Sequence, residues 1–246
     1  MINLKNGQQI CLPEAVIFDT DNTLYPYDPA HKAAIKSVAK KAKKIFGISE
    51  DEFTQAFDYS RLEIKKILGS TASSHSRLLY FQRTIEYLEM GTRILTTLDL
   101  EQTYWRTFLA NAKLFPEAVE FLQLLKNKGI KTANITDLTA QIQFRKMVYF
   151  GLDEYFDYVV TSEESGCDKP NVRIFNIALK KLNIPANKIW MIGDDSNADM
   201  AGAHNVEMVK IQKIHDNVII DLHNDGKADL VFESYKCLIK LISSNI

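Results

Sequence analysis

Two carboxylates, one residue apart, are the first residues of the chain whose types and spacing can do chemistry. Asp19 and Asp21 directly follow the apolar residues 15–18. Side chains alternate between the two faces of an extended segment, so these acids leave the strand end on the same side. Such a pair can bind a hard cation, or it can supply a carboxylate nucleophile and a general acid/base. Asp, Asn and Thr also favour turns, so the pair alone is equally compatible with an Asx-type turn.

More polar residues of this kind follow other apolar runs. Strands predicted at 131–135, 158–161 and 189–192 are each followed by candidates, which are Thr136, Lys169, Asp194 and Asp195. Ligands of open parallel sheets bind at the carboxyl ends of the strands. The sequence therefore predicts that these side chains meet Asp19 and Asp21 at one edge of a sheet.

So many acids at one edge need a cation. Asp194, Asp195 and Asp199 add to the first pair, and clustered carboxylates repel one another unless a divalent cation or a basic side chain offsets them. Mg²⁺ prefers oxygen ligands and commonly bridges to a substrate phosphate. The alternative for Asp194 and Asp195 is helix N-capping, which accounts for one of them but not for both.

Thr136 and Lys169 are the groups expected to hold an anion. Thr136 presents a hydroxyl where a strand leads into a helix, whose free backbone N–H groups favour anions. Lys169 is a compact positive charge suited to clamping a phosphate, and Pro170 after it is expected at the first position of a helix. The alternatives are an ordinary strand-to-helix turn and a surface lysine. Asp137 is expected to be the N-cap of the following helix.

The elements that must position these groups alternate along most of the chain. Strands at 208–211 and from Leu230 onward follow those already named, and helices are predicted between them, at 116–128 and 139–150 among others. Such alternation predicts an α/β fold, a Rossmann-like, mostly parallel sheet flanked by helices. We assign residues 1–24 and 113–246 to this core.

Residues 25–112 have a different pattern and are predicted to form an inserted, all-helical cap domain. The first helix carries an apolar stripe of Ile35, Val38, Ala42 and Ile45. The second is expected to begin after Ser49, three residues before Glu52, a capping-box spacing, and to run to about residue 68. Helices at about 75–89 and 100–112 complete the block.

The composition excludes several classes of protein. The chain has 246 residues and a formal net charge of -1, which provides no electrostatic footprint for a nucleic acid polymer. No apolar run is long enough to span a membrane, and the N-terminus lacks a signal pattern. The three cysteines are scattered and lack metal-ligand spacing. We expect a cytoplasmic protein without structural zinc, either a monomer or a homodimer.

Taken together, these strand-end segments resemble the motifs of the haloacid dehalogenase-like (HAD) hydrolase superfamily, and the resemblance covers nearly all of residues 15–212. Motif one is matched by residues 19–23, motif two by 135–137, motif three by Lys169-Pro170 and motif four by 193–199. The position of the helical insert resembles the subfamily with a cap between motifs one and two, and residues 155–170 resemble its nucleotidase-like and sugar-phosphatase-like branch.

The resemblance implies a role for each motif residue. Asp19 would attack phosphorus and become an aspartyl phosphate, and Asp21 would protonate the leaving oxygen and then activate water. Thr136 and Lys169 would hold the phosphoryl oxygens. Mg²⁺ would be bound by Asp19, the backbone carbonyl of Asp21, and Asp194. Support would come from Asp195 or Asp199, and the sequence leaves open which of the two provides it.

The expected reaction is phosphate ester hydrolysis, because dehalogenases of the superfamily lack the second acid of motif one. The expected substrate is a small soluble phosphomonoester, a nucleotide or a sugar phosphate. A phosphotransferase or phosphomutase with the same aspartyl phosphate, and a non-catalytic phosphometabolite-binding protein, are the alternatives. One departure is Asp137, where related members often carry Asn. Candidate substrate contacts in the cap are Tyr25, Tyr27, His75 and Arg77.

Overall fold

The computed structural model describes residues 2–4, 11–215, 218–221 and 225–244. Residues of the chain form two compact units. One comprises Met1–Pro26 together with Lys113–Ile246, and the other is Tyr27–Ala112. We refer to them as the core unit and the helical unit, and Tyr25 belongs to the core unit.

The core unit is built on a seven-stranded sheet with the order β1-β7-β6-β5-β2-β3-β4. Strand β1 is antiparallel to β7, and all other neighbouring strands are parallel. The strands are β1 (Ile2–Leu4), β2 (Ala15–Phe18), β3 (Lys131–Thr136), β4 (Tyr158–Thr161), β5 (Ile189–Gly193), β6 (Val209–Lys213) and β7 (Leu230–Phe232). The predicted α/β fold with a mostly parallel sheet is confirmed.

The register of the central strands sets the position of the site. Phe18, at the end of β2, lies opposite Asn134 of β3 and Ile192 of β5. All four residues of β2 are buried, as expected of a parallel strand covered on both faces. The chain segments that follow β2, β3 and β5 therefore leave the sheet at the same edge.

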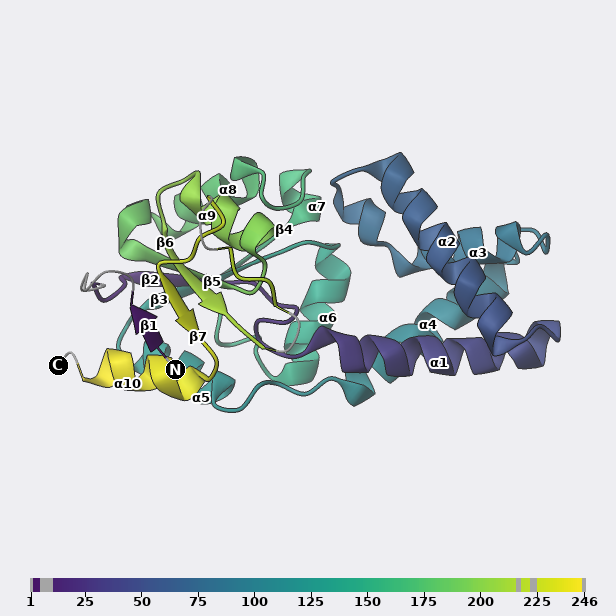
Figure 1. The fold of residues 1–246 in the computed structure, drawn as a ribbon, viewed down its shortest axis with the longest axis horizontal. Coiled ribbons are helices and arrows are strands. Elements are labelled where there is room, and N and C mark those ends of the chain that lie inside the picture. The colour runs from purple at the N-terminus through teal and green to yellow at the C-terminus, as the bar shows by residue number, and fades with distance from the viewer. Residues whose placement is uncertain (1, 5–10, 216–217, 222–224, 245–246) are drawn as a thin grey trace. The chain divides into compact units, whose positions relative to one another are not determined.

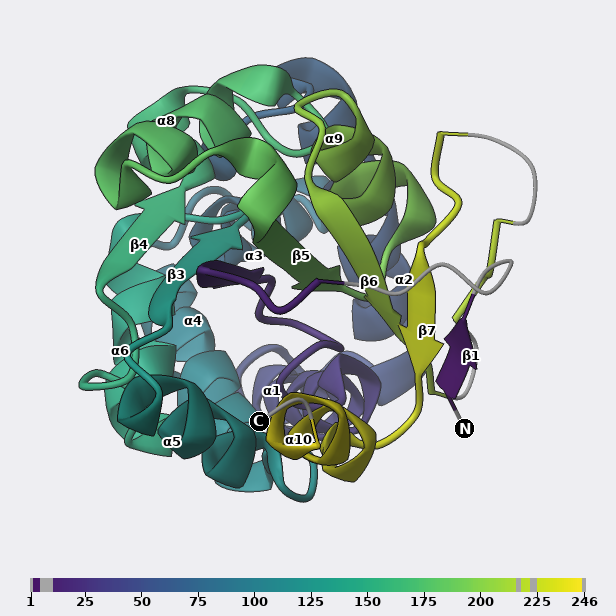
Figure 2. The ribbon, with the colours of Figure 1, turned by 90° about the vertical axis from the view of Figure 1, so that its left-hand side faces the viewer.

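Helices cover both faces of the sheet (Figure 2). Helices α8 (Val172–Leu182) and α9 (Ala201–His204) lie on one face, and α5 (Ala118–Asn127) and α10 (Tyr235–Ser243) lie on the other. Helix α6 (Ala140–Phe150) and the short α7 (Ser162–Ser165) contact β4, and a 3-10 turn (Ala186–Lys188) precedes β5. The core under α8 is hydrophobic and includes Phe175, Ala178 and Leu182.

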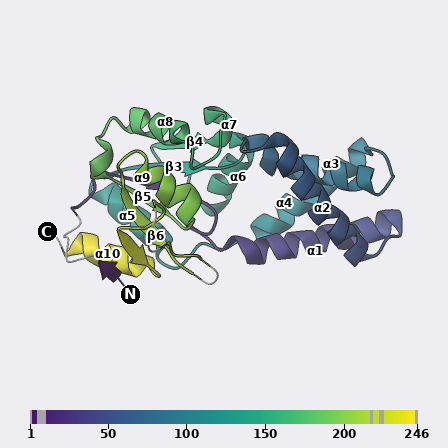
Figure 3. The ribbon, with the colours of Figure 1, turned by 45° about the horizontal axis from the view of Figure 1, so that its top comes forward.

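The helical unit consists of α1 (Tyr27–Phe46), α2 (Glu50–Leu68), α3 (Arg77–Tyr87) and α4 (Ile94–Asn111), with a 3-10 turn at Ala72–His75 (Figure 1 and Figure 3). Helix α1 packs against α2 and α4, and α3 packs against the same two helices. The buried side chains are largely aromatic and include Phe53, Phe57, Tyr80, Phe81, Tyr104, Trp105 and Phe108. In this unit the predicted helices are found, and no strand interrupts them.

Several local expectations for the helical unit need comment. The Ser49 side chain accepts a hydrogen bond from the Glu52 backbone N–H, as predicted. The predicted stripe on α1 is wrong at Ile45, which is 45% exposed. The buried face of α1 is formed instead by small residues, Ala30, Ala34, Val38, Ala39 and Ala42, because α1 packs closely on its neighbours there. Among the described residues, no helix has both the length and the hydropathy needed to cross a membrane.

Candidate active site

Asp19 lies at the end of β2 in a buried ion-pair cluster. The Lys169 ammonium donates to Asp19 Oδ1 at 2.5 Å and to Asp199 Oδ1 at 2.7 Å. The side chains of Lys169, Asp19 and Asp199 are only 4%, 9% and 1% exposed. The Thr23 hydroxyl donates to the other oxygen of Asp19 at 3.0 Å. Both oxygens of the Asp19 carboxylate are thus held in place, which fixes the direction in which it can react.

Asp194 joins this cluster from the end of β5. Oxygen atoms of Asp19, Asp194 and Asp199 all lie within 4.8 Å of one another. Burial, followed by the neighbouring carboxylates, raises the pKa of Asp194 to about 9, and burial raises the pKa of Asp19 to about 7 although Lys169 opposes it. Three carboxylates facing one lysine leave uncompensated negative charge, and an all-oxygen donor set of this kind fits a hard divalent cation.

The structure separates the roles of Asp195 and Asp199. Asp195 is exposed and is the N-cap of the short π-helix Ser196–Met200, where its side chain accepts the backbone N–H groups of Asn197 and Ala198 at 2.7 and 2.9 Å. The Asp199 carboxylate points back to the cluster and accepts the Asp195 N–H at 3.1 Å. A Cβ atom at Gly193 would lie 2.3 Å from Asp199 Cγ, so only glycine admits this approach.

Asp21 is held by residues that the sequence analysis did not assign to it. The Lys146 ammonium donates to both of its carboxylate oxygens, at 2.8 and 3.0 Å, and the Tyr25 hydroxyl donates to Oδ1. Lys146 comes from α6 and its side chain is 1% exposed. Tyr25 is fully buried and its hydroxyl contacts Asp21, and its role as a substrate contact stays a prediction.

Thr136, at the end of β3, is buried and is oriented by α6. Gln143 Nε2 donates to the Thr136 Oγ1 atom at 2.6 Å. Because the hydroxyl oxygen accepts this hydrogen bond, its own hydrogen can be donated to an anion. Asn134, two residues earlier on β3, donates to the Phe18 carbonyl at 2.9 Å and so fixes the segment that leads to Asp19.

Two expectations around Lys169 are wrong. Asp137 is not the N-cap of α6, a position occupied by Thr139. The Asp137 carboxylate instead accepts the backbone N–H of Lys169 at 3.0 Å, which anchors the segment that carries the lysine. Pro170 is not the first residue of a helix either, because α8 begins at Val172 and is capped by the side chain of Asn171.

The other candidates lie together in the helical unit. Arg77, at the start of α3, donates to the hydroxyls of Tyr27 and Tyr104 and to the carbonyl of His75. The His31 Nδ1 atom lies 2.8 Å from the Tyr104 hydroxyl. Burial, reinforced by the Arg77 charge, lowers the pKa of His31 to about 4, which keeps this imidazole neutral at physiological pH.

Another buried lysine, Lys213, was also missed. Lys213 ends β6 and is 2% exposed. Its ammonium donates to the Ile214 carbonyl at 2.8 Å and lies 4.1 Å from the ring centre of Phe115. Burial lowers its pKa to about 8, although Asp194 opposes this. The only signal in the sequence was a lysine within an otherwise buried run, since partners so far apart in the chain cannot be read from spacing.

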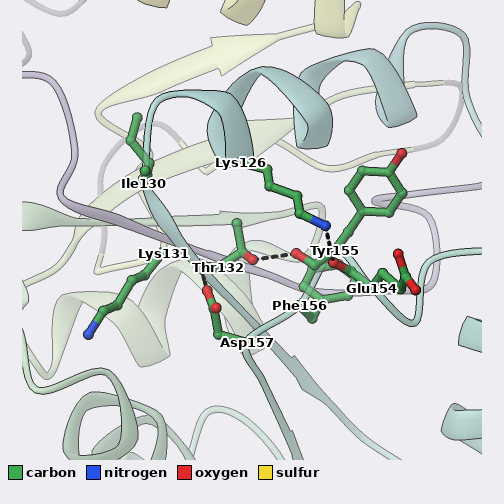
Figure 4. A pocket seen from close by; sticks show the side chains of 9 residues that line it. Lys126, Ile130, Lys131, Thr132, Glu154, Tyr155, Phe156 and Asp157 are labelled. Carbon is green, nitrogen blue, oxygen red and sulfur yellow. Dashed lines mark hydrogen bonds between the residues drawn. The ribbon is translucent and has the colours of Figure 1, made fainter.

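A pocket at the opposite edge of the sheet provides a contrast (Figure 4). It is lined by residues at the start of β3 and before β4, where the Thr132 hydroxyl donates to the Tyr155 carbonyl and Lys126 donates to the Glu154 carbonyl at 3.1 Å. The Asp157 carboxylate accepts the Thr132 N–H at 2.8 Å. The hydrogen-bonding groups that face this pocket therefore pair largely with one another, and we place the chemistry at the carboxyl edge.

A Rossmann-like sheet with a buried carboxylate–lysine cluster at the carboxyl ends of its strands defines a class of α/β hydrolases. The sequence model of the haloacid dehalogenase-like hydrolase family matches residues 13–207. This chain belongs to that family. The predicted superfamily is confirmed.

Similar proteins narrow the chemistry. The chain is 39% identical over 193 residues to a ribulose-1,5-bisphosphate 5-phosphatase of Halopiger xanaduensis, covering 78% of this chain and 81% of the other. It is 33% identical over 199 residues to a glyceraldehyde 3-phosphate phosphatase of Methanothermobacter thermautotrophicus, with coverages of 80% and 84%. The crystal structure of a HAD phosphatase from Thermococcus onnurineus has the same fold, with a TM-score of 0.71, 23% identity and coverages of 93% and 97%. The prediction of an enzyme, a phosphoric monoester hydrolase, is confirmed.

Proposed function

We propose that this phosphatase hydrolyses a small sugar phosphate through an aspartyl phosphate on Asp19, with Mg²⁺ as its metal. The single observation that carries the proposal is the buried cluster of Asp19, Lys169, Asp194 and Asp199. It contains a restrained carboxylate nucleophile, a cation for the phosphoryl oxygens, and an oxygen-rich site for a metal. Covalent catalysis of this kind divides one difficult displacement into two easier ones.

The Asp19 carboxylate attacks phosphorus, and the bond between phosphorus and the ester oxygen breaks. Asp21 gives its proton to that oxygen, which leaves as an alcohol. Water then attacks phosphorus, Asp21 takes one of its protons, and inorganic phosphate leaves with Asp19 restored. Lys169 and the Thr136 hydroxyl hold the phosphoryl oxygens through both steps, because the Lys169 ammonium contacts Asp19 and the Thr136 hydroxyl has its hydrogen available to an anion.

Asp19, Asp194 and the backbone carbonyl of Asp21 would hold Mg²⁺, and Asp199 would support the site. Asp199 is favoured over Asp195 because its oxygens lie in the cluster, whereas Asp195 caps the short π-helix. When bound, the ion supplies positive charge for the phosphoryl oxygens. The donor set is all oxygen, which suits Mg²⁺.

A sugar phosphate is favoured over a nucleotide. The support is the activity of two relatives, which are phosphatases of ribulose-1,5-bisphosphate and of glyceraldehyde 3-phosphate. Tyr27, His75 and Arg77 are the proposed substrate contacts of the helical unit, where the guanidinium offers a fixed positive charge. The proposed compartment is the cytoplasm, supported by three cysteines without disulfides.

The test is phosphate release from a panel of sugar and nucleotide monophosphates, with Mg²⁺ and with EDTA, for the wild type and for Asp19→Asn. We expect release from sugar phosphates that requires Mg²⁺ and is lost in the variant. Metal-independent release, or release that survives Asp19→Asn, would contradict the mechanism. Release from nucleotides alone would contradict the substrate class.

A further inference from the structure

We propose that Lys146 is a positioning residue for Asp21, a role that rests on the proposed function of Asp21 as the acid and base of the reaction. Lys146 lies outside the segments 19–23, 135–137, 169–170 and 193–199 that define the site in the sequence. It is separated from Asp21 by 125 residues along the chain. The two side chains meet only because α6 packs beside the end of the sheet.

The contact is an ion pair in which the Lys146 ammonium reaches both oxygens of the Asp21 carboxylate. Lys146 Nζ lies 2.8 Å from Asp21 Oδ1 and 3.0 Å from Oδ2, so one ammonium spans the whole carboxylate. The Tyr25 hydroxyl donates to Oδ1 as well, and the Lys146 ammonium lies 5.8 Å from the centre of the Tyr25 ring. A carboxylate held by two donors on fixed supports has one preferred orientation.

The two side chains of this ion pair differ in how far they are buried. The Lys146 side chain is 1% exposed, whereas that of Asp21 is 34% exposed. A buried ammonium is unfavourable unless it is paired, so the ion pair with the Asp21 carboxylate stabilises Lys146 in this position. Asp21 keeps one side toward solvent, which is the side from which a substrate oxygen or a water molecule arrives. Lys146 thus supports the acid from behind without occupying its reactive side.

Helix α6 makes this support rigid. Gln143 and Lys146 are three residues apart and lie on the same buried face of the helix. Gln143 holds the Thr136 hydroxyl while Lys146 holds Asp21. One helix face therefore aligns the phosphoryl-binding hydroxyl with the proton-transfer group, and alignment of this kind contributes strongly to rate.

The consequence is a dependence on the leaving group. An alkyl phosphate, such as a sugar phosphate, needs the proton from Asp21 because an alkoxide is a poor leaving group. The p-nitrophenolate ion leaves without a proton. Hydrolysis of the aspartyl phosphate also uses Asp21 and is common to both esters, so the comparison is made on kcat/KM, which reports the first step. Misplacing Asp21 should therefore lower kcat/KM for the alkyl ester far more than for the aryl ester, whereas general damage to the site should lower both.

The experiment compares Lys146→Met with the wild type on both esters at saturating Mg²⁺. We expect kcat/KM for the sugar phosphate to fall by about tenfold to a hundredfold, and kcat/KM for p-nitrophenyl phosphate to fall by no more than about threefold. Arg145→Met is the matched control, because Arg145 precedes Lys146 on α6 but is exposed, and it should alter neither reaction. Lys146→Arg, which keeps the charge, should recover part of the lost rate on the sugar phosphate.

Equal losses of kcat/KM on both esters, or no loss on the sugar phosphate, would overturn the proposal. A second measurement decides the matter independently of activity. Thermal unfolding of Lys146→Met, Asp21→Asn and the double variant in metal-free buffer forms a double-mutant cycle. We expect the double variant to lose less Tm than the sum of the single losses, and additive losses would contradict the pairing. A wild type inactive on every ester would defeat the proposed function, while the cycle would still test the pair.

Discussion

The two units of this enzyme hold their buried charges in different ways. In the core unit, Lys169 faces the carboxylates of Asp19 and Asp199, and Lys146 faces that of Asp21. In the helical unit, the Arg77 guanidinium lies 5.4–5.9 Å from the centres of four aromatic rings, those of Tyr27, Tyr80, Tyr104 and Trp105. Its hydrogen bonds go to phenol and carbonyl oxygens.

This difference agrees with the proposed division between chemistry in the core unit and substrate recognition in the helical unit. A carboxylate–lysine cluster can bind a metal, accept a phosphoryl group and exchange protons, because its members change charge or ligands during a reaction. An arginine among aromatic rings keeps its charge throughout, since its pKa lies far above the physiological range. The core unit is thus suited to the reaction, and the cluster around Arg77 is suited to holding a fixed charge for a ligand.

The largest effect is expected from removing the cation that serves both acids. Lys169→Met leaves Asp19 and Asp199 buried without their ammonium partner. We expect loss of phosphate release to background and a decrease of about 3–5 kcal/mol in the free energy of unfolding, measured with urea in metal-free buffer. Lys188→Met is the control, since Lys188 is an exposed partner of Glu14 and should alter neither property. A Lys169→Met enzyme that keeps a tenth of the wild-type rate would contradict the view that the core cluster requires this lysine.

The metal site provides the next effect. A cation that binds only the folded protein stabilises it by about 2.7 kcal/mol at a hundred times its dissociation constant. We expect Mg²⁺ to raise the Tm of the wild type and to raise that of Asp194→Asn much less, because the variant loses a ligand from the core cluster. An equal rise in both proteins would place the cation elsewhere.

The pH dependence of the metal-free protein follows from the core acids. Asp19 and Asp194 have pKa values raised from 3.8 to about 7 and about 9, so the folded state keeps protons that the unfolded chain has already lost. Stability is therefore greatest at low pH with respect to these groups, and it is lost as pH rises from 3.8 to about 7 for Asp19 and from 3.8 to about 9 for Asp194. His31, with its pKa lowered from 6.5 to about 4, acts in the opposite sense, since its contribution is lost as pH falls from 6.5 to 4.

The difference in Tm between the Mg²⁺-bound and the metal-free protein reports on the core cluster alone. We expect the increase in Tm caused by Mg²⁺ to be larger at pH 8 than at pH 5.5, because the cation must displace the protons of Asp19 and Asp194 at the lower pH. At each pH the contribution of His31 to stability is the same with and without Mg²⁺, so it cancels from the increase in Tm. An increase that does not change with pH would show that these acids do not bind the cation.

A smaller and more selective effect is expected in the helical unit. Arg77→Met removes the hydrogen bonds to Tyr27, Tyr104 and the His75 carbonyl, and we expect it to cost about 1–3 kcal/mol of stability. It should raise KM for the sugar phosphate more than it lowers kcat, because it leaves the core cluster intact. Arg83→Met is the matched control on the same helix, where the lost partner is Glu63. A fall in kcat alone would place Arg77 with the chemistry and remove the distinction between the units.

Much of the site could be predicted because it follows from strand ends. A short apolar run that ends in Asp19, and another that ends in Gly193-Asp194, suffices to bring these acids together in a parallel sheet. The register of β2 with β5, in which Phe18 lies opposite Ile192, brings the ends of the two strands together. The fold class follows from the same alternation of elements.

The remainder depended on contacts that no spacing reveals. Lys146 and Lys213 are lysines in buried elements, and their surroundings are set by how α6 and β6 pack. Asp137 was expected to cap a helix, a local interaction, but the backbone N–H of Lys169 competes for the same carboxylate from 32 residues away. Local preferences gave way where the tertiary structure offered a buried donor.

The most direct test of the central claim is to trap the intermediate. The enzyme is mixed with its sugar phosphate and Mg²⁺, quenched in acid within one turnover, digested and analysed by mass spectrometry. We expect a single phosphoryl group on the peptide that contains Asp19, and none on the corresponding peptide of Asp19→Asn. Turnover without any phosphorylated peptide, or a phosphoryl group on another residue, would contradict the account.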